Sequence, residues 1–250
     1  MITLKSKREI ELLKEAGHIV YLTHQYLRPH IKAGIKTIEL DRLAEDFIRS
    51  KGATPSFKGY EGFPYTLCIS INDEVVHGFP SERTLKDGDI ISIDIGACYK
   101  GYHGDSAWTY QVGEISSEAK YLLEHTEKAL YEGIKQAKVG NRIGDISAAI
   151  EKYATKHNLG VVKELVGHGV GTSVHESPDV PNYGKEGTGP RIKDGMVIAI
   201  EPMLTSGSPD IYVEDNDWTV VTDDGSLSAH YEHTIAITND GVIILTGEWF

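Results

Sequence analysis

The sequence has few cysteines, the residues whose disulfides stabilise small secreted domains. Its 250 residues include only two cysteines, Cys68 and Cys98, and their separation matches no metal-binding pattern. A chain of this length can bury roughly three quarters of the surface that its unfolded form exposes, so it needs no disulfide for stability. We therefore expect both cysteines to be reduced core residues, as in proteins of reducing compartments.

Long hydrophobic runs are also absent. No run of about 18 apolar residues occurs, and residues 1–7 carry positive charge with no apolar stretch behind them. The sequence therefore predicts neither a membrane span nor a secretory signal. We expect a cytoplasmic protein without a membrane partner.

Basic residues are in the minority. There are 25 lysines and arginines against 37 acidic residues, a net charge of −12, and no Lys/Arg block stands out. This balance disfavours binding along a phosphate backbone, so no direct nucleic-acid partner is expected.

One segment occurs twice. Residues 85–94 and 192–201 both contain an Asp-Gly pair, an apolar stretch, and a carboxylate seven positions after the Asp. Asp-Gly favours a tight turn and the apolar stretch predicts a buried strand, so the strands present Asp94 and Glu201 in equivalent ways. Two such acids can converge near a pseudo-symmetry axis, where a metal ion or shared protons must offset their repulsion.

Helical patterns precede both copies. The sequence predicts helices over 6–28 and 37–50 in the first half, and over 116–137 and 143–157 in the second. Ser6 and Glu9 have the spacing of a capping box. No Pro-, Gly- or Ser-rich linker separates the halves, although chance repetition of common elements is the alternative explanation. We predict one α+β domain over 1–250, with pseudo-symmetric halves of about 1–112 and 113–250.

Two aspartates flank a predicted hairpin. Asp94 and Asp105 lie on strands that turn around Lys100 and Gly101. Antiparallel pairing would bring both carboxylates within reach of a common ion. Either aspartate alone would be typical of an edge charge or a turn neighbour, but together, in otherwise apolar strands, they indicate a functional site.

A histidine stands between two glycines. Gly167 and Gly169 remove side-chain bulk around His168, so its ring can reach a ligand held close to the backbone. His168 is a candidate metal ligand, and His175 is a candidate hydrogen-bond donor to the substrate. Gly-His-Gly alone is equally typical of a bend with a hydrogen-bonded histidine.

Two glutamates lie beside apolar strands. An unpaired charge at Glu201 or Glu232 would cost several kcal/mol, and neither strand offers a neighbouring lysine or arginine for a salt bridge. The simplest joint solution is a metal site. Its predicted ligands are Asp94, Asp105, His168, Glu201 and Glu232.

Four carboxylates are balanced by two divalent cations better than by one. Oxygen-rich ligation with a single imidazole and no thiolate suits Mn(II), Fe(II), Co(II) or Zn(II) in an open catalytic site. Two ions about 3.5–4 Å apart can share a bridging water, lower its pKa and stabilise the oxyanion formed when it attacks a carbonyl or phosphoryl group.

In order and spacing, these motifs resemble the metal ligands of the methionine aminopeptidases, which belong to the pita-bread metallopeptidases. The resemblance covers nearly the whole chain and implies two pseudo-symmetric α+β halves around a central antiparallel sheet flanked by helices. Only 33 residues separate His168 from Glu201, which leaves no room for an inserted helical subdomain. The chain therefore resembles the compact bacterial type I form, for which we expect no extension before Ile10.

The resemblance also implies metal-binding roles. Asp94 would bind the first metal, His168 and Glu201 the second, and Asp105 and Glu232 would bridge both. Glu201 would in addition serve as the proton-shuttling base for the nucleophilic water.

Two further histidines match substrate-binding positions of the family. His77 would contact the substrate near the scissile amide. His175 would hydrogen-bond the carbonyl oxygen and stabilise the tetrahedral intermediate.

The pocket for the methionine side chain should be a snug apolar cavity. The chain departs from the family pattern at two pocket positions: position 57 is Phe where family members can have a small residue, and position 174 is Val where they can have a bulkier one. We expect this gain and this loss of side-chain volume to offset each other in the pocket. The matching pocket positions are Tyr60, Phe63, Cys68 and Trp218.

These features predict a cytoplasmic, monomeric enzyme that removes the initiator methionine from nascent chains when the next residue is small. Its expected partners are nascent N-termini, with a transient association with ribosomes. One alternative is an Xaa-Pro aminopeptidase or prolidase, which uses the same ligands but usually carries an extra N-terminal domain. The other is an inert pita-bread protein that only binds peptides or a partner, which would be expected to lack some of the ligands.

Overall fold

The structure is a computed structural model that describes residues 1–248, so the last two residues of the predicted 1–250 domain lie outside it. All four predicted helices are confirmed, each to within one residue at either end. The helices are α1 (Lys7–Leu27), α2 (Thr37–Ser50), α3 (Ser117–Gln136) and α4 (Ile143–Lys156), with short 3₁₀ turns η1 (Arg28–His30) and η2 (Tyr60–Gly62).

The strands pair antiparallel throughout the described residues. One sheet has the order β1-β4-β2 with β5 paired to β4, and another has the order β15-β14-β9-β7-β8; two three-stranded sheets are β13-β10-β6 and β11-β12-β3. The bounds are β1 (Thr54–Pro55), β2 (Leu67–Ile71), β3 (Glu74–Val76), β4 (Ile90–Tyr99), β5 (Tyr102–Gln111), β6 (Gly160–Val161), β7 (Gly167–Gly169), β8 (Glu176–Val180), β9 (Met196–Ile200), β10 (Met203–Thr205), β11 (Ile211–Val213), β12 (Val220–Thr222), β13 (Ser228–His230), β14 (His233–Thr238) and β15 (Gly241–Ile244).

Local chemistry explains where several elements begin. Ser6 accepts from the Glu9 backbone N–H while the Glu9 carboxylate accepts from the Ser6 N–H, so the predicted capping box starts α1. Gly88 and Gly195, in the two Asp-Gly turns, have φ of 95° and 86°. This left-handed conformation is one that glycine adopts without strain, and it reverses the chain just before β4 and β9.

The same backbone contacts occur in both halves. The Gly34 N–H donates to Leu85 O at 2.9 Å, and the Gly140 N–H donates to Ile192 O at 3.0 Å. Each bond ties the segment before a helix, α2 or α4, to the segment before an Asp-Gly turn. The two copies therefore have the same local structure.

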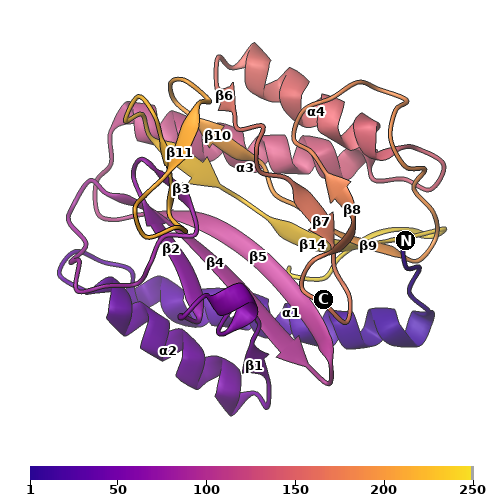
Figure 1. Cartoon of the computed structure of the whole chain (residues 1–250), viewed down its shortest axis with the longest axis horizontal. Helices are drawn as coiled ribbons and strands as arrows, with labels where there is room; N and C mark the ends of the chain where they lie inside the picture. Colours follow the sequence, from indigo (N-terminus) through magenta and orange to yellow (C-terminus); the bar gives the residue numbers. More distant parts are fainter. Residues whose placement is uncertain (249–250) are drawn as a thin grey trace.

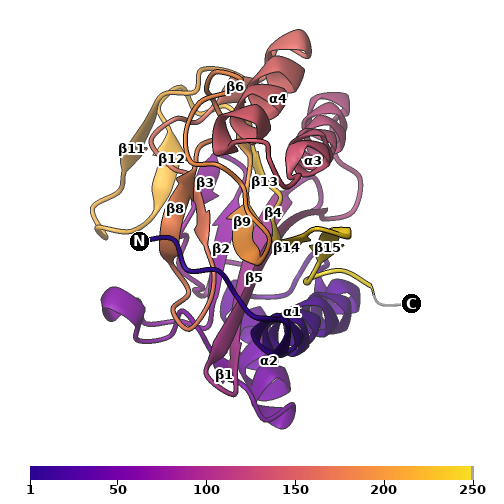
Figure 2. The same cartoon turned by 90° about the vertical axis from the view of Figure 1, so that its right-hand side faces the viewer.

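The two largest hydrophobic clusters among residues 1–248 pack the helices against the strands. In Figure 1 the strands cross the middle of the molecule, with α1 and α2 below and α3 and α4 above. Figure 2 places β11 and β12 on the side opposite α1 and α3. Residues of α1 and α2 pack on β2 and β4, and residues of α3 and α4 pack on β9 and β14.

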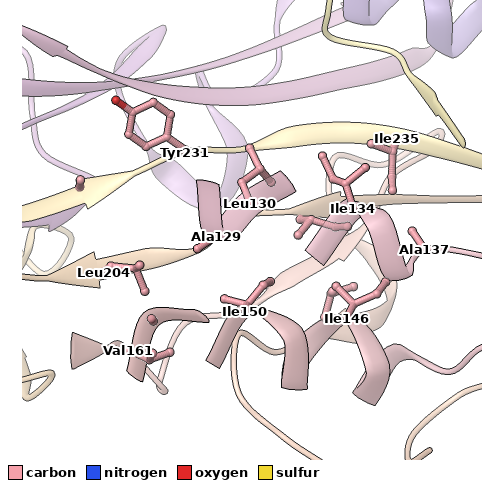
Figure 3. Packing of buried hydrophobic residues seen from close by; sticks show 14 of the residues in the cluster. Ala129, Leu130, Ile134, Ala137, Ile146, Ile150, Val161, Leu204, Tyr231 and Ile235 are labelled. Carbon is pink, nitrogen blue, oxygen red and sulfur yellow. The ribbon is translucent and has the colours of Figure 1, made fainter. Parts of the chain in front are cut away.

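The second core is tightly interdigitated. In Figure 3, Ile134 of α3 lies among Ile146 and Ile150 of α4 and Ile235 of β14. Ile146, Ile150 and Ile235 are completely buried. Packing of this kind makes the strands a rigid platform for side chains on their other face.

Neither cysteine is in a disulfide. Cys68 is buried as expected, but Cys98 near the end of β4 is only half-buried, so its assignment to the core is corrected. The ladder explains this position, because Cys98 pairs with Thr54 of the two-residue strand β1 at the edge of the sheet. Within residues 1–248, no helix combines the length and apolar character needed to cross a bilayer.

Candidate metal centre and active site

The hairpin of β4 and β5 brings the two aspartates together. It turns at Lys100 and Gly101 as predicted, and both have positive φ. Asp94 pairs with Ala107 and Asp105 pairs with Gly96, so the aspartates are diagonal neighbours on one face of the ladder. Gly96 supplies no side chain to separate the two carboxylates.

The other three residues come from the five-stranded sheet. His168 is the centre of β7, Glu201 directly follows β9, and Glu232 directly precedes β14. The Glu232 N–H donates to Ala107 O at 2.8 Å, which joins this sheet to β5. Both halves of the chain therefore supply side chains to one site.

All five residues converge. Potential ligand atoms of Asp94, Asp105 and Glu232 lie within 4.8 Å of one another, as do those of His168, Glu201 and Glu232. His168 Nε2 is 3.7 Å from Asp105 Oδ2 and 3.5 Å from Glu201 Oε1. A third group of the same compactness joins Asp105 and His168 to His175.

The Gly-His-Gly segment is required by close packing. A Cβ on Gly167 would lie 2.4 Å from Ala199 O, and one on Gly169 would lie 2.4 Å from Ser177 O. Both glycines thus let β7 fit between β9 and β8. Close backbone approach, rather than an unusual φ, is the reason for glycine here.

Hydrogen bonding fixes the tautomer of His168. Its Nδ1 lies 2.9 Å from Gly169 O, and a carbonyl can only accept, so Nδ1 carries the proton. The Nε2 lone pair then faces Asp105 and Glu201. This is the arrangement of a metal-ligating imidazole with a backbone acceptor behind it.

Within residues 1–248, Asp94, Asp105 and Glu232 form no ion pair with a lysine or arginine. Burial first, and neighbouring acids second, raise the pKa of Asp105 and of Glu232 well above the ordinary range; burial likewise raises the pKa of Asp94 to about 7. Within the described part of the chain, Asp94 Oδ1, Asp105 Oδ1 and both carboxylate oxygens of Glu232 lack a hydrogen-bond partner. Buried acceptors of this kind fit divalent cations, which would supply the missing positive charge.

Sequence reasoning missed the partner of Glu201. His230 Nε2 lies 3.3 Å from Glu201 Oε2. Burial alone would raise the pKa of Glu201, but the adjacent His230 ring, with His168 nearby, holds it below the ordinary value. The signal was present, since His230 stands two residues before Glu232, a spacing that can place two side chains on one face of extended chain.

His175 and His77 lie beside the carboxylate cluster. The His175 ring packs edge-on against His168, with centroids 4.2 Å apart, and its Nδ1 lies 3.1 Å from the Tyr60 hydroxyl. Desolvation of the ring beside the cluster lowers the pKa of His175 to about 4, so the ring is neutral at physiological pH. His77 follows β3 with φ of 59°, a conformation that costs energy in a non-glycine residue and is common at functional sites.

A cavity of about 130 Å³ is lined at one end by the five clustered residues and at the other by all four predicted pocket residues. The Phe63 and Trp218 rings meet edge to face at 5.1 Å, and burial keeps the Cys68 thiol protonated by raising its pKa. Phe57 and Val174 belong to the same buried cluster. Tyr65 and Phe79, which sequence reasoning missed, support Phe63 from behind with centroids 6.1 and 5.5 Å away.

Comparison with known proteins identifies the family. The model of metallopeptidase family M24 matches residues 11–239. Over 246 residues, the chain is 57% identical to methionine aminopeptidase 1 of Bacillus subtilis and 52% identical to methionine aminopeptidase of Clostridium perfringens, covering 98% of this chain and 99% of each relative. The chain belongs to metallopeptidase family M24, among the type I methionine aminopeptidases.

Solved structures agree with this assignment. Methionine aminopeptidase from Thermotoga maritima superposes with a TM-score of 0.97 at 43% identity, covering 99% of this chain and all (100%) of that one. Prolidase from Pyrococcus furiosus gives 0.78 at 24% identity, covering 99% of this chain and 66% of that one, and so shares the fold alone. The predicted pita-bread fold and peptidase activity are confirmed, and neither alternative is favoured.

Proposed function

We propose that the clustered acids and His168 hold two divalent cations with which this aminopeptidase removes the initiator methionine from nascent proteins whose second residue is small. The observation that carries the proposal is the buried set of carboxylate oxygens without partners. Such a set is costly in a stable protein unless cations complete it.

The ligand roles follow the family pattern. Asp94 would bind one cation, His168 and Glu201 the other, and Asp105 and Glu232 would bridge them. When bound, Mn(II), Fe(II), Co(II) or Zn(II) polarises the scissile carbonyl and lowers the pKa of water. Glu201, whose pKa stays low beside His230, is ionised and can accept a proton from the attacking water and pass it to the leaving amine.

His175 would donate to the carbonyl oxygen. It is neutral, so one ring nitrogen must accept while the other donates. A hydrogen bond donated by the Tyr60 hydroxyl to Nδ1 would leave the proton on Nε2, ready for the oxygen on which negative charge develops. His77, held 6.2 Å from the Trp218 ring between centroids, would contact the substrate next to the scissile amide.

The substrate side chain would enter the aromatic end of the cavity. Tyr60, Phe63, Cys68 and Trp218 line it together with Phe57. A flexible thioether suits a pocket of aromatic edges and a thiol, because sulfur makes favourable contacts with aromatic rings. Nascent N-termini in the cytoplasm, reached during a transient encounter of the monomeric enzyme with ribosomes, are the proposed partners.

Two assays test the proposal. Metal-loaded enzyme should cleave Met-Ala-Ser and leave Ala-Pro-Ala intact; cleavage of only the proline peptide would favour the prolidase alternative, and no cleavage at any metal loading would favour the inert binder. His175→Ala should lower kcat by about 10²–10³-fold with metal content unchanged. Loss of metal instead would make His175 a ligand, in keeping with its place beside Asp105 and His168.

A further inference from the structure

A lysine ahead of the first helix is buried next to the site. The Lys5 side chain is only 3% exposed, and its Nζ lies 2.5 Å from Glu176 Oε2. The Glu176 side chain is 16% exposed. Lysine is rarely buried unless it is paired, so the burial of Lys5 against an acid calls for an explanation.

Glu176 closes the loop that carries His175. Its Oε1 accepts from the Ser173 N–H at 3.3 Å, and Ser173 O accepts from the Gly171 N–H at 3.0 Å. Burial would raise the pKa of Glu176, but the hydrogen bond from Lys5 holds it below the ordinary value, so the pair is ionic. The carboxylate that fixes this loop is therefore itself fixed by Lys5.

The pair lies directly against the loop backbone. A Cβ on Gly171 would lie 2.2 Å from Glu176 Oε1 and 2.6 Å from Lys5 Nζ. Gly171 O in turn accepts from the His103 N–H at 2.9 Å, which ties the loop to β5. Glycine at position 171 is what allows the ammonium and carboxylate groups to approach this closely.

The backbone of Lys5 is anchored as well. Its N–H donates to Gly195 O at 2.7 Å, in the Asp-Gly turn before β9. The N-terminal segment thus spans from that turn, which leads to Glu201, to the loop of His175. Lys5 therefore contacts both the turn that leads to Glu201 and the loop that carries His175.

We propose that Lys5 is a positioning residue for the aminopeptidase reaction, which holds the His175 ring in its working position through Glu176. The inference rests on the proposed role of His175 and makes no claim that Lys5 touches substrate. Tyr60 fixes the ring at Nδ1, and the Lys5–Glu176 pair fixes the backbone from which the ring projects. Without the Lys5–Glu176 pair, the His175 ring would adopt several positions, while the cavity and the candidate metal ligands would stay in place.

The test is a set of Lys5 variants compared in kcat and KM for Met-Ala-Ser. Lys5→Met should lower kcat about tenfold with KM and bound metal unchanged, because misplacing a catalytic group affects the chemical step. Lys5→Arg should recover most of kcat, since it keeps the charge. Lys7→Met, two residues along and exposed, is the matched control and should leave kcat unchanged.

A double-mutant cycle separates positioning from general destabilisation. In a His175→Ala background, Lys5→Met should cost nothing further in kcat, whereas an independent structural effect would cost the same tenfold again.

Full kcat in soluble, folded Lys5→Met would overturn the proposal. If Lys5→Met fails to fold, Glu176→Gln in both backgrounds gives the same comparison. If His175→Ala alone keeps full kcat, the role of His175 fails first, which distinguishes the two failures.

Discussion

His230 Nε2 lies 3.3 Å from Glu201 Oε2, and the His230 side chain is 2% exposed. The His230 backbone is itself held, since its N–H donates to Thr109 Oγ1 at 2.9 Å and its carbonyl accepts from the same hydroxyl. The ring projects from this fixed backbone to lie beside Glu201, where it favours the ionised form of the carboxylate. Outer partners of metal ligands commonly have this function.

Replacing His230 should therefore impair the enzyme without unfolding it. We expect His230→Ala to lower kcat or metal affinity by about 10–100-fold, because Glu201 loses its partner. Steady-state kinetics at saturating metal and calorimetric metal titration would measure the two effects. His230→Gln, which can still donate a hydrogen bond, should be less affected, and wild-type values for the alanine variant would remove His230 from the site.

Metal binding should strengthen as the pH rises. Burial raises the pKa of Asp94 to about 7 in the metal-free protein, from an ordinary 3.8. A raised folded-state pKa stabilises the protein below the unfolded pKa, and this contribution is lost as the pH rises through about 7. Cations need the ionised form, so binding at low pH must expel protons.

The stabilisation produced by Mn²⁺ should accordingly be larger at about pH 8 than at about pH 6, reaching about 2.7 kcal/mol at a free concentration of about 100 Kd. Thermal melts with and without metal would measure it, and calorimetry in buffers of different ionisation enthalpy would count the protons released. Asp94→Asn should weaken binding and flatten this pH dependence. A pH-independent metal effect in the wild-type protein would contradict the assignment.

Structural elements that depend on neighbouring residues could be predicted from the sequence alone. Asp-Gly turns, the Ser6 cap and the periodicity of the helices depend on neighbouring residues, so these elements were predictable. The convergence of Asp94 with Glu201 was inferable because the segment is repeated. The convergence of the five candidate ligands was predictable because each is an acid or histidine with no local partner.

Contacts between distant segments that share no repeat or motif were not predicted. His230 lies beside Glu201, and Lys5 pairs with Glu176, and in both cases the sequence does not identify which distant residue is the partner. The burial of Cys98 was wrongly predicted for the same reason, because it depends on the length of the strand that pairs with β4 on that side, which is the two-residue strand β1. Motifs identify groups that need partners, but only the fold shows which partners they have.

Glycine at position 169 should be irreplaceable. Gly169→Ala would put a methyl group 2.4 Å from Ser177 O, a contact with backbone that cannot rotate away. We expect a loss of about 1–3 kcal/mol in stability and a displacement of His168. Chemical denaturation would measure the first and metal content the second. Gly187→Ala is the control, because φ at Gly187 is 73° and no atom lies near the added methyl group, so it measures the cost of backbone strain without a clash. Equal losses of stability in the two variants would show that the close packing of β7 is unimportant.

Phe57 and Val174 should be energetically coupled through the methionine pocket. Both are buried in one cluster with Phe63 and Cys68, so a larger residue at 174 competes for space with the ring at 57. Val174→Phe alone should raise KM for Met-Ala-Ser about tenfold and lower stability by about 1–3 kcal/mol through overpacking. Phe57→Cys alone should leave a void, lower stability and also raise KM, since the thioether loses contacts. The double variant should approach wild-type KM, because one ring then replaces the other. Kinetics and denaturation of all four proteins would give the coupling energy, and strictly additive effects would show that the two positions do not share the pocket.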